Sequence, residues 1–341
     1  MWKKFEDVLD IINGKNQKKV ENPNGIYPIY GSGGVMGYAD DYLCEANTVV
    51  IGRKGSINNP IYVEEPFWNV DTAFGLVARK NVLLPKYLYF FCVHYDFDKL
   101  NTTVTIPSLT KANLLKIEID VPNIEEQKKI VEKLDSIVEL VRLQKEQIEQ
   151  MDTLIKSRFV EMFGDPEINQ RGLSVLNWEN VFITTTGKLD SNAMIPNGKY
   201  PFFTCAKESF WIDQYAFDCE ALLLAGNNAA GVYDVKHYKG KFNAYQRTYV
   251  LRLVDENWSY VLFKRQLEEK LEYLREQSKG TNTRYLTMEI LNGLQFIIPD
   301  IAEQNQFTRF VHQVDKLKLT AKESLKKLEI MQKALMQQYF C

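Results

Sequence analysis

Basic and aromatic side chains alternate over residues 235–254, and this stretch contains no acidic residue. Its cations are Lys236, Lys239, Lys241, Arg247 and Arg252, and its aromatic residues include Tyr238, Phe242, Tyr245 and Tyr249. Cations among aromatic rings can hold phosphate groups and stack on or line a groove. An ordinary pair of strands with a solvated face would give the same pattern, so the stretch alone favours neither interpretation.

Two smaller groups of residues have the same chemistry. The stretch SKGTNTR at 278–284 places two cations in a loop, and its counterpart in the first half of the chain is NTTVTIPSLTK at 101–111. The adjacent pair Arg53 and Lys54 is a weaker basic signal in that half. Each group could supply phosphate contacts.

The sequence lacks the motifs of nucleotide-dependent and metal-dependent enzymes. YGSGGVMG at 30–37 has the glycines of a phosphate loop, but no helical pattern follows it, which favours a turn. NPIY at 59–62 resembles the Asn-Pro-Pro-Tyr motif of amino-methyltransferases, but Ile61 replaces the second proline and no cofactor-binding unit precedes it. The three histidines are isolated, and no Walker loop, HExxH or GxSxG occurs. We expect no catalytic residue, no metal site and no cofactor.

The composition is typical of a soluble globular protein, with 341 residues, 45% hydrophobic and 25% charged. The net charge of −2 does not indicate a nucleic-acid binder, so any such function must depend on local patches. The start MWKKFEDVLD lacks a signal-peptide core and no long apolar run follows, so we expect a cytoplasmic protein. The five cysteines are never spaced CxxC and suit reduced thiols.

A helix-start signal that would position these loops occurs twice, 177 residues apart. Pro122 blocks a helix before it, Asn123 can serve as the N-cap, and Glu126 completes a capping box. The second copy fills the same roles with Pro299, Asp300 and Glu303. The likeness continues at the same offset in the pairs Gln127 and Gln304, Lys156 and Lys333, and Phe163 and Phe340.

Each signal is followed by ten positions that recur with a period of 3.5, eight of them apolar, and we call each set a seam. The first seam is Ile130, Leu134, Ile137, Val141, Gln144, Ile148, Met151, Ile155, Arg158 and Met162. The second is Phe307, Val311, Val314, Lys318, Ala321, Leu325, Leu328, Gln332, Leu335 and Tyr339. This pattern predicts two long helices, at 122–163 and 299–341, that pair with each other. Two helices packed separately on their own domains are the alternative.

Residues 1–121 and 174–298 are strand-rich and resemble each other, with a linker at 164–173. YPIYGS at 27–32 matches YPFFTC at 200–205, VVIGRKGS at 49–56 matches LLLAGNNA at 222–229, VDTAFGLV at 70–77 matches YQRTYVLR at 245–252, and IPSLTKANLLKIEIDVP at 106–122 matches TRYLTMEILNGLQFIIP at 283–299. The framework therefore repeats, whereas many loop residues differ.

These features resemble the DNA-sequence specificity subunits of type I restriction–modification systems. The likeness is carried by YPIYGSGG, TVVIGRKGS, SLTKANLLKIEIDVPNIEEQKKIVEKLD and LIKSRFVEMFGDP, with the second copies YPFFTC, LTMEILNGLQFIIPDIAEQ and MQKALMQQYF. No one of these motifs is highly specific. The order of variable domain, helix start and long helix, which occurs twice over nearly the whole chain, is specific.

The resemblance implies an α+β fold, in which two strand-rich target recognition domains related by pseudo-two-fold symmetry are separated by two long antiparallel coiled-coil helices. It implies that each domain reads one half of an asymmetric, bipartite site on double-stranded DNA. It also implies that methyltransferase subunits dock on this framework, and we expect two of them. Motor-nuclease subunits would join the complex for cleavage. The chain itself would catalyse nothing and bind no cofactor.

Base reading under this hypothesis needs side chains that match base edges, with Arg or Lys at guanine and Asn or Gln at adenine. By residue type and loop position, the candidates for base contacts are Arg53, Lys54, Asn58, Asn227, Asn228, Gln246, Arg247 and Asn282. The candidates for phosphate contacts are Ser32, Ser56, Lys207, Lys241, Lys279 and Arg284.

Two other functions fit part of the pattern. A self-contained adenine methyltransferase would transfer methyl groups to DNA without a partner. A coiled-coil scaffold with two protein-binding heads would show no sequence-dependent DNA binding even with a methyltransferase partner present.

Overall fold

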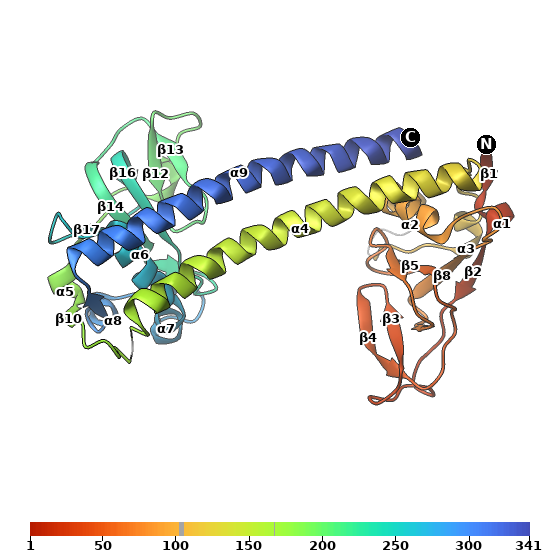
Figure 1. The fold of residues 1–341 in the computed structure, drawn as a ribbon, viewed down its shortest axis with the longest axis horizontal. Coiled ribbons are helices and arrows are strands. Elements are labelled where there is room, and N and C mark those ends of the chain that lie inside the picture. Colours follow the sequence, from red (N-terminus) through yellow and green to blue (C-terminus); the bar gives the residue numbers. More distant parts are fainter. Residues whose placement is uncertain (102–105, 167) are drawn as a thin grey trace. The chain divides into compact units, whose positions relative to one another are not determined.

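The computed structural model describes residues 1–101, 106–166 and 168–341, so four residues of the stretch 101–111 lie outside the description. The chain forms two compact units (Figure 1). The first comprises Met1–Gln147 with Ala321–Cys341, and the second comprises Ile148–Thr320. The units cut across the expected segments because each includes one strand-rich domain together with part of both long helices.

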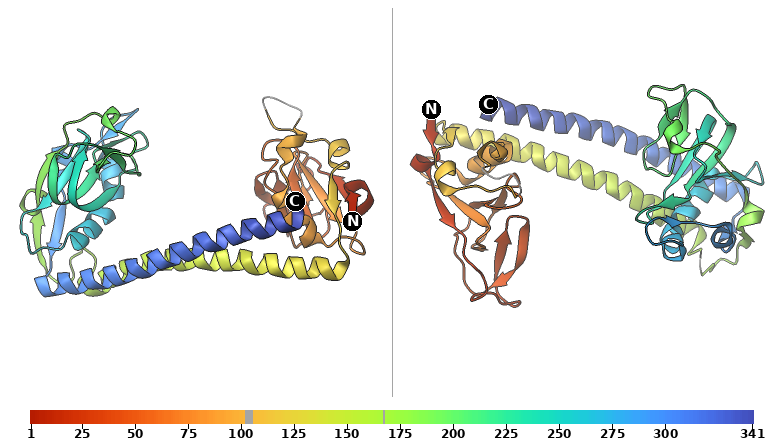
Figure 2. Two further views of the ribbon diagram at one scale, coloured as in Figure 1. Left: turned by 90° about the horizontal axis from the view of Figure 1, so that it is seen from above. Right: turned by 180° about the vertical axis from the view of Figure 1, so that it is seen from behind.

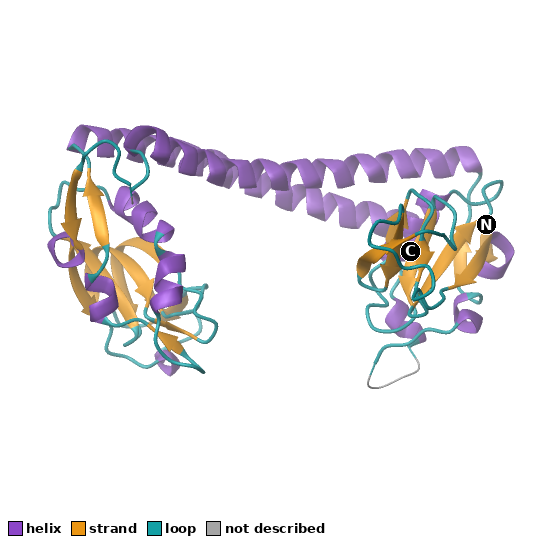
Figure 3. Cartoon of the chain, turned by 90° about the horizontal axis from the view of Figure 1, so that it is seen from below, coloured by secondary structure: helices purple, strands orange, loops and turns teal. Residues whose placement is uncertain are grey.

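The first unit contains two small sheets and a strand pair (Figure 3). One sheet has the order β2 (Leu9–Asn13), β8 (Ala73–Ala78), β5 (Thr48–Gly52) and β6 (Ile61–Val63); the other has the order β4 (Gly34–Ala39), β3 (Tyr27–Gly31) and β7 (Trp68–Asn69). β1 (Trp2–Lys4) pairs with β9 (Glu118–Asp120). The helices of the domain are α1 (Phe5–Val8), α2 (Pro85–His94), a 3-10 turn at Phe97–Leu100 and α3 (Lys111–Leu114).

The second unit repeats this plan around one six-stranded sheet. Its order is β11 (Phe182–Thr186), β17 (Thr248–Leu253), β14 (Phe217–Ala225), β16 (Val235–Ala244), β12 (Tyr200–Phe203) and β13 (Phe210–Ile212). Two strand pairs complete it, β10 (Ser174–Asn177) with β19 (Gln295–Ile298) and β15 (Asn227–Asn228) with β18 (Arg284–Tyr285). Its helices are α5 (Trp178–Val181), a 3-10 turn at Ser191–Ala193, α6 (Tyr260–Glu269), α7 (Leu271–Gln277) and α8 (Met288–Asn292). The mixed helix and strand content and the internal repeat confirm the predicted fold class.

The two long helices are α4 (Ile124–Phe163) and α9 (Ile301–Phe340). Asn123 caps α4, because its Oδ1 accepts a hydrogen bond of 2.9 Å from Glu126 N. Among the described residues, neither Glu126 nor Glu303 forms a side-chain hydrogen bond to its helix start, so both predicted capping boxes are incomplete. Glu303 instead accepts from Arg171 at 2.8 Å. α4 ends where Gly164, with φ of 77°, donates its N–H to Val160 O.

The long helices run antiparallel to each other within each unit (Figure 2). In the first unit Lys145 Nζ lies 3.1 Å from Glu329 Oε1. In the second unit Lys318 forms an ion pair with Asp152, and the rings of Phe159 and Phe307 lie 5.7 Å apart. Every position of both seams is buried or half-buried, which is the pattern of a paired helix seam.

Two buried glutamines attach the strand-rich domains to the long helices. Gln127 Oε1 accepts from Leu84 N at 2.8 Å, and its Nε2 donates to Val82 O at 2.9 Å and Pro122 O at 2.8 Å. Gln304 Oε1 accepts from Ser259 N at 3.0 Å, and its Nε2 donates to Pro299 O at 2.8 Å. Because Leu84 and Ser259 are the N-caps of α2 and α6, each amide joins the start of a long helix to the start of a domain helix.

Candidate nucleic-acid interface

Four loops of the second unit meet where strands of its sheet begin or end. The loop after β14 is bound to the turn before β17, because Gly226 N donates to Arg247 O at 2.8 Å. The segment before α8 joins them through Leu286 N, which donates to Gly226 O at 2.8 Å. The loop after β12 completes the set, since Cys205 Sγ lies 3.3 Å from Arg247 O. These four segments, 205–207, 226–228, 246–247 and 284–286, form what we call the loop edge of this unit.

The first unit builds the same loop edge from the corresponding segments, 32, 53–56, 71–72 and 107–109. Arg53 N donates to Thr72 O at 2.8 Å, and Leu109 N donates to Arg53 O at 2.9 Å. Gly52 allows the close approach, because a Cβ there would lie 2.3 Å from Ser56 O and 3.0 Å from Ser32 Cβ. Main-chain hydrogen bonds therefore join most segments of both loop edges, and the Sγ of Cys205 supplies the contact to the loop after β12 in the second unit.

The strand registers fix which residues of the two loop edges correspond. Gly52 pairs with Ala73 in the first unit, and Ala225 pairs with Thr248 in the second. Counting outward from these pairs gives the matches Arg53 with Gly226, Lys54 with Asn227, Asp71 with Gln246, and Thr72 with Arg247. Matching positions thus differ in chemistry. The cation of Lys54 corresponds to the amide of Asn227, and the acid of Asp71 corresponds to the amide of Gln246.

The first unit brings most of its predicted residues to the loop edge. Arg53, Lys54 and Ser56 are exposed there, and Ser32 is half-buried beside them. Asn58 differs, because its Nδ2 donates to Asp98 Oδ2 at 2.7 Å and its Oδ1 accepts from Phe97 N at 2.7 Å. Both ends of this amide support the 3-10 turn, so its predicted contact with a base would require these bonds to break.

The second unit places Asn227, Gln246 and Arg247 at its loop edge. Gln246 and Arg247 are exposed, and the Nε2 of Gln246 donates a long hydrogen bond of 3.4 Å to Asp190 Oδ2, which a contact with adenine would replace. Asn228 lies next to them but has a structural bond, since its Oδ1 accepts from Ala230 N at 2.8 Å and from Val232 N at 3.2 Å. Asn228 therefore shapes the loop that presents Asn227.

The predicted phosphate ligands of the second unit differ in how available they are. Lys207 and the base candidate Asn282 are exposed. Lys279 Nζ lies 2.9 Å from Glu289 Oε2, and this hydrogen bond raises the pKa of Lys279 above its ordinary value. Arg284 donates from Nη1 to Arg275 O at 3.0 Å. Lys279 and Arg284 can thus meet phosphate only in addition to, or in place of, these contacts.

The stretch 235–254 is a pair of strands, β16 and β17, rather than one continuous basic surface. Lys236 lies 2.8 Å from Asp234, and Lys239 lies 2.9 Å from Glu220. Lys241 stands opposite Asp218, at the end of the β14–β16 ladder away from Val235, with its ammonium 4.6 Å from the centre of the Tyr215 ring. The structure does not bring Lys241 to the loop edge with Arg247.

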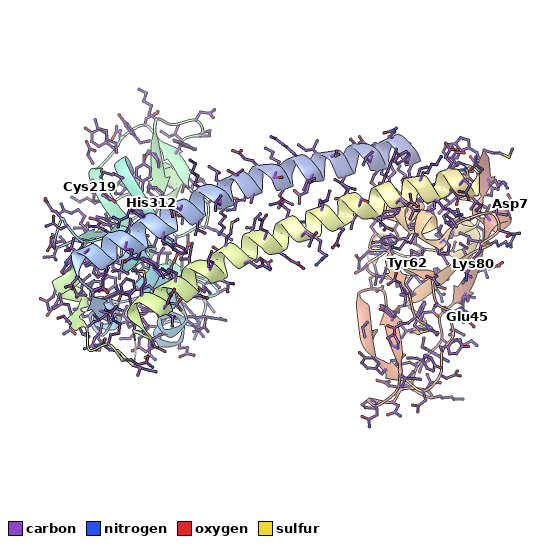
Figure 4. All side chains as sticks on the ribbon, viewed as in Figure 1. Asp7, Glu45, Tyr62, Lys80, Cys219 and His312 are labelled. Atoms are coloured by element: carbon purple, nitrogen blue, oxygen red, sulfur yellow. The ribbon has the colours of Figure 1, made fainter. Side chains whose placement is uncertain are left out.

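Each unit also has a groove between its domain helix and its segments of the long helices. In the first unit a cavity of about 350 Å³ lies between α2, α4 and α9. Its lining combines the apolar Tyr89, Phe90, Val93, Val138 and Met336 with the polar His94, Glu329, Gln332 and Lys333. In the second unit a cavity of about 610 Å³ is lined by charged residues, including Lys264, Arg265, Glu268, Asp315 and Lys318. His312 of α9 also lines this second groove and is labelled in Figure 4. Burial lowers the pKa of Arg265 below its ordinary value.

The described part of the chain contains no cluster of three or more His, Cys, Asp or Glu side chains that could hold a metal ion. Among the described helices, none has the length and apolar character needed to cross a bilayer. Asp71 is a loop-edge residue that residue type alone did not indicate. The signal that identifies it is its register match with Gln246.

Comparisons with known proteins agree with this geometry. The family described as type I restriction modification DNA specificity domain matches residues 1–152 and again residues 177–330. The EcoDI type I restriction enzyme specificity subunit of Escherichia coli is 40% identical over 122 residues, which are 35% of this chain and 26% of that protein. A putative type I specificity subunit of Haemophilus influenzae is 28% identical over 145 residues, 41% of this chain and 37% of that protein. The aligned segments therefore span less than half of these relatives.

Solved structures share the fold over the whole chain. The S subunit of a type I restriction–modification system from M. genitalium superposes with a TM-score of 0.71 at 16% identity, covering 100% of this chain and 96% of that one. A chain from a structural study of complex assembly in the type I system gives a TM-score of 0.57 at 17% identity, covering 99% and 97%. At these identities the likeness supports the fold alone.

Proposed function

Because the chain belongs to the type I restriction–modification DNA specificity family, we propose that it recognises an asymmetric, bipartite site on double-stranded DNA. The observation that carries the proposal is the pair of loop edges, which have matching main chains and different side chains. Each loop edge presents polar or cationic groups beside a sheet end. Such groups are the ones that contact base edges and phosphates.

The two loop edges support two different half-sites. The first presents Arg53 and Lys54, whereas the second presents Asn227 and Gln246 together with Arg247. Cations favour the guanine edge in the major groove, and amides favour the adenine edge. Unlike side chains at matching positions cannot favour the same base edges, so the target should be two different half-sequences separated by a fixed gap.

The chain acts as a non-catalytic subunit under this proposal and recruits methyltransferase and motor-nuclease subunits. Support for two copies of one partner comes from exposed apolar residues at matching positions of the long helices. Leu140 and Leu317 are 50% and 60% exposed, and Leu154 and Met331 are 50% and 51% exposed. Single exposed apolar residues are common on protein surfaces, so the support lies in the match of both pairs across the repeat rather than in their exposure.

The direct test is methylome sequencing of cells with and without this gene. We expect one bipartite, asymmetric methylated motif to disappear when the gene is removed. Replacing residues 174–298 with the corresponding domain of another family member should change one half of the motif and keep the other half and the gap. A continuous palindromic motif, or a replacement that changes both halves, would contradict the proposal.

The purified chain provides the second test. Alone it should transfer no methyl groups to DNA, and together with its methyltransferase subunit it should bind DNA in a sequence-dependent way. Methyl transfer by the chain alone would indicate a self-contained enzyme. Absence of sequence-dependent binding by the complex would indicate a scaffold without a DNA role.

A further inference from the structure

Asp71 occupies a rigid turn at the loop edge of the first unit, between β7 and β8. Val70 N donates to Tyr30 O at 3.0 Å, and Ala73 N donates to Val70 O at 2.9 Å. Thr72 O accepts from Arg53 N at 2.8 Å on the other side of the turn. These main-chain bonds hold the Cα of Asp71 in place, and its side chain is exposed.

The carboxylate of Asp71 has no partner within the described part of the chain, although two cations lie on the adjoining loop. Arg53 Nη1 approaches the main-chain oxygen of Asp71 at 3.5 Å, and its guanidinium carbon lies 5.8 Å from the centre of the Phe74 ring. Among the residues that the structure describes, none forms an ion pair or hydrogen bond with the Asp71 carboxylate. The geometry therefore does not indicate that Asp71 holds these cations in place.

An unpaired carboxylate on a surface that meets DNA opposes binding, because it faces the negative phosphates. An amino group of a base in the major groove can compensate for this repulsion. The N4 amino group of cytosine suits Asp or Glu, whereas the N6 amino group of adenine lies beside the N7 acceptor, which repels a carboxylate. The register match with Gln246 supports this role, since Gln246 carries an amide at the same backbone position, and amides pair with adenine.

We propose that Asp71 reads a cytosine in the half-site of the first unit, and that Gln246 reads an adenine from the matching position in the second. This inference rests on the proposed function and adds the identity of one base pair in each half-site. The residue type at this backbone position determines which base is preferred, because the main chain that presents it is the same in both units.

The test is the variant Asp71→Gln, which gives the first unit the residue type found at position 246. The complete complex with its methyltransferase subunit would be assayed against a DNA library in which each half-site is randomised in turn. We expect the preference at one base pair of the first half-site to move from C·G to A·T, by about 5- to 100-fold. The other positions of both half-sites should keep their preferences.

The reciprocal variant Gln246→Asp should move one position of the second half-site toward C·G. A matched control is Glu64→Gln, which also removes an exposed acid from this domain but lies outside the loop edge, and which should leave every position unchanged. Asp71→Gln with an unchanged preference profile, in a complex that still binds its site, would overturn the inference and leave the proposed function intact. Loss of sequence preference in the unmodified complex would instead overturn the proposed function.

Discussion

The first unit packs its long helices with Ile130, Met336 and Phe340, whereas the second fills the corresponding positions with Phe307, Phe159 and Phe163. In the second unit, the three rings lie 5.2 to 5.7 Å apart in edge-on arrangements. In the first, Phe340 packs instead on Tyr87 and Phe91 of the domain helix. The same backbone therefore accepts two different sets of core side chains, because each set fills the space between the helices and the domain.

A second pair of matching positions differs in charge rather than in volume. In the first unit Tyr62 donates to Asn47 Oδ1 at 2.7 Å, which is a neutral hydrogen bond. In the second unit His237 and Glu220 occupy these positions at 2.9 Å, and Lys239 adds an ion pair. The grooves differ in the same sense, because charged side chains form a larger part of the lining in the second unit than in the first. The comparison teaches that the repeat preserves main-chain contacts and leaves side-chain chemistry free to differ.

The largest expected difference lies in the helix–domain core. Phe307→Ala should lower the free energy of unfolding of the second unit by about 3–5 kcal/mol, because the ring is fully buried between two others. Ile130→Ala should cost the first unit about 2–4 kcal/mol. Hydrogen exchange resolved by unit would measure both. Equal losses in both units after Phe307→Ala alone would contradict this localisation.

The buried glutamines should give the next largest effect. Gln127→Leu leaves the N–H of Leu84 and two carbonyl oxygens without their partner, and should cost about 2–4 kcal/mol. Gln304→Leu removes two such bonds and should cost less. Urea unfolding followed by a probe in each unit would compare them. The exposed Gln147→Leu, on the surface of α4, is the matched control and should change stability little.

Substitutions at the two loop edges should have smaller effects, which would be seen in the free energy of DNA binding. Arg53→Ala and Arg247→Ala should each weaken binding by about 1–3 kcal/mol and relax one position in one half-site, if the side chain reads a base edge. If the side chain contacts phosphate, affinity should fall for all sequences and its salt dependence should become shallower. Binding titrations at several salt concentrations distinguish the two results. A change in the distant half-site would contradict the independence of the two loop edges.

The smallest expected effect is a pH dependence confined to the second unit. Burial opposes the ionisation of Glu220, but hydrogen bonds from Lys239 and His237 outweigh it and hold the pKa of Glu220 below its ordinary value. A carboxyl group whose pKa is lower in the folded state stabilises the protein above its unfolded pKa, and this contribution disappears as the pH falls through the folded value.

Glu220→Gln should therefore reduce stability at pH 7 by less than about 1 kcal/mol and should have no effect in acid below the folded pKa. Asn47→Ala, its counterpart in the first unit, should change stability by an amount that does not vary over this pH range. Thermal melts of both variants between pH 3 and pH 8 would measure the contrast. Equal pH dependence in both variants would remove the distinction between the ionic and the neutral pair.

The sequence was sufficient for features that depend on local chemistry. The capping residues and the 3.5-residue period placed the long helices, and their starts differ from the observed Ile124 and Ile301 by two residues. Turn residues and strand-forming residues recur in the same order in both halves, which predicted the mixed fold and the internal repeat. The observed elements confirm both.

Features that depend on contacts between distant residues could not be predicted in this way. The amides of Asn58 and Asn228 are bound to the protein, and Lys236 and Lys239 have acidic partners. Residue type did not indicate Asp71, although the match of VDTAFGLV with YQRTYVLR already pairs it with Gln246, as the strand register does. Residue type identifies what a side chain can bind, but its availability is decided by neighbours that the sequence does not reveal.

Under the proposed function, the main-chain bonds of the loop edges bear on how easily recognition can change. Arg53, Thr72 and Leu109 are joined through peptide groups, which every amino acid except proline supplies in full. Of these three residues Arg53 is exposed, Thr72 is half-buried and Leu109 is buried in the core. A substitution at an exposed position such as Arg53 can therefore alter what is recognised with little loss of stability, so selection for folding leaves it free to vary. Evolvability of recognition is concentrated where side chains do not support the scaffold, and it is lowest at Gly52, where any Cβ would meet the backbone of Ser56.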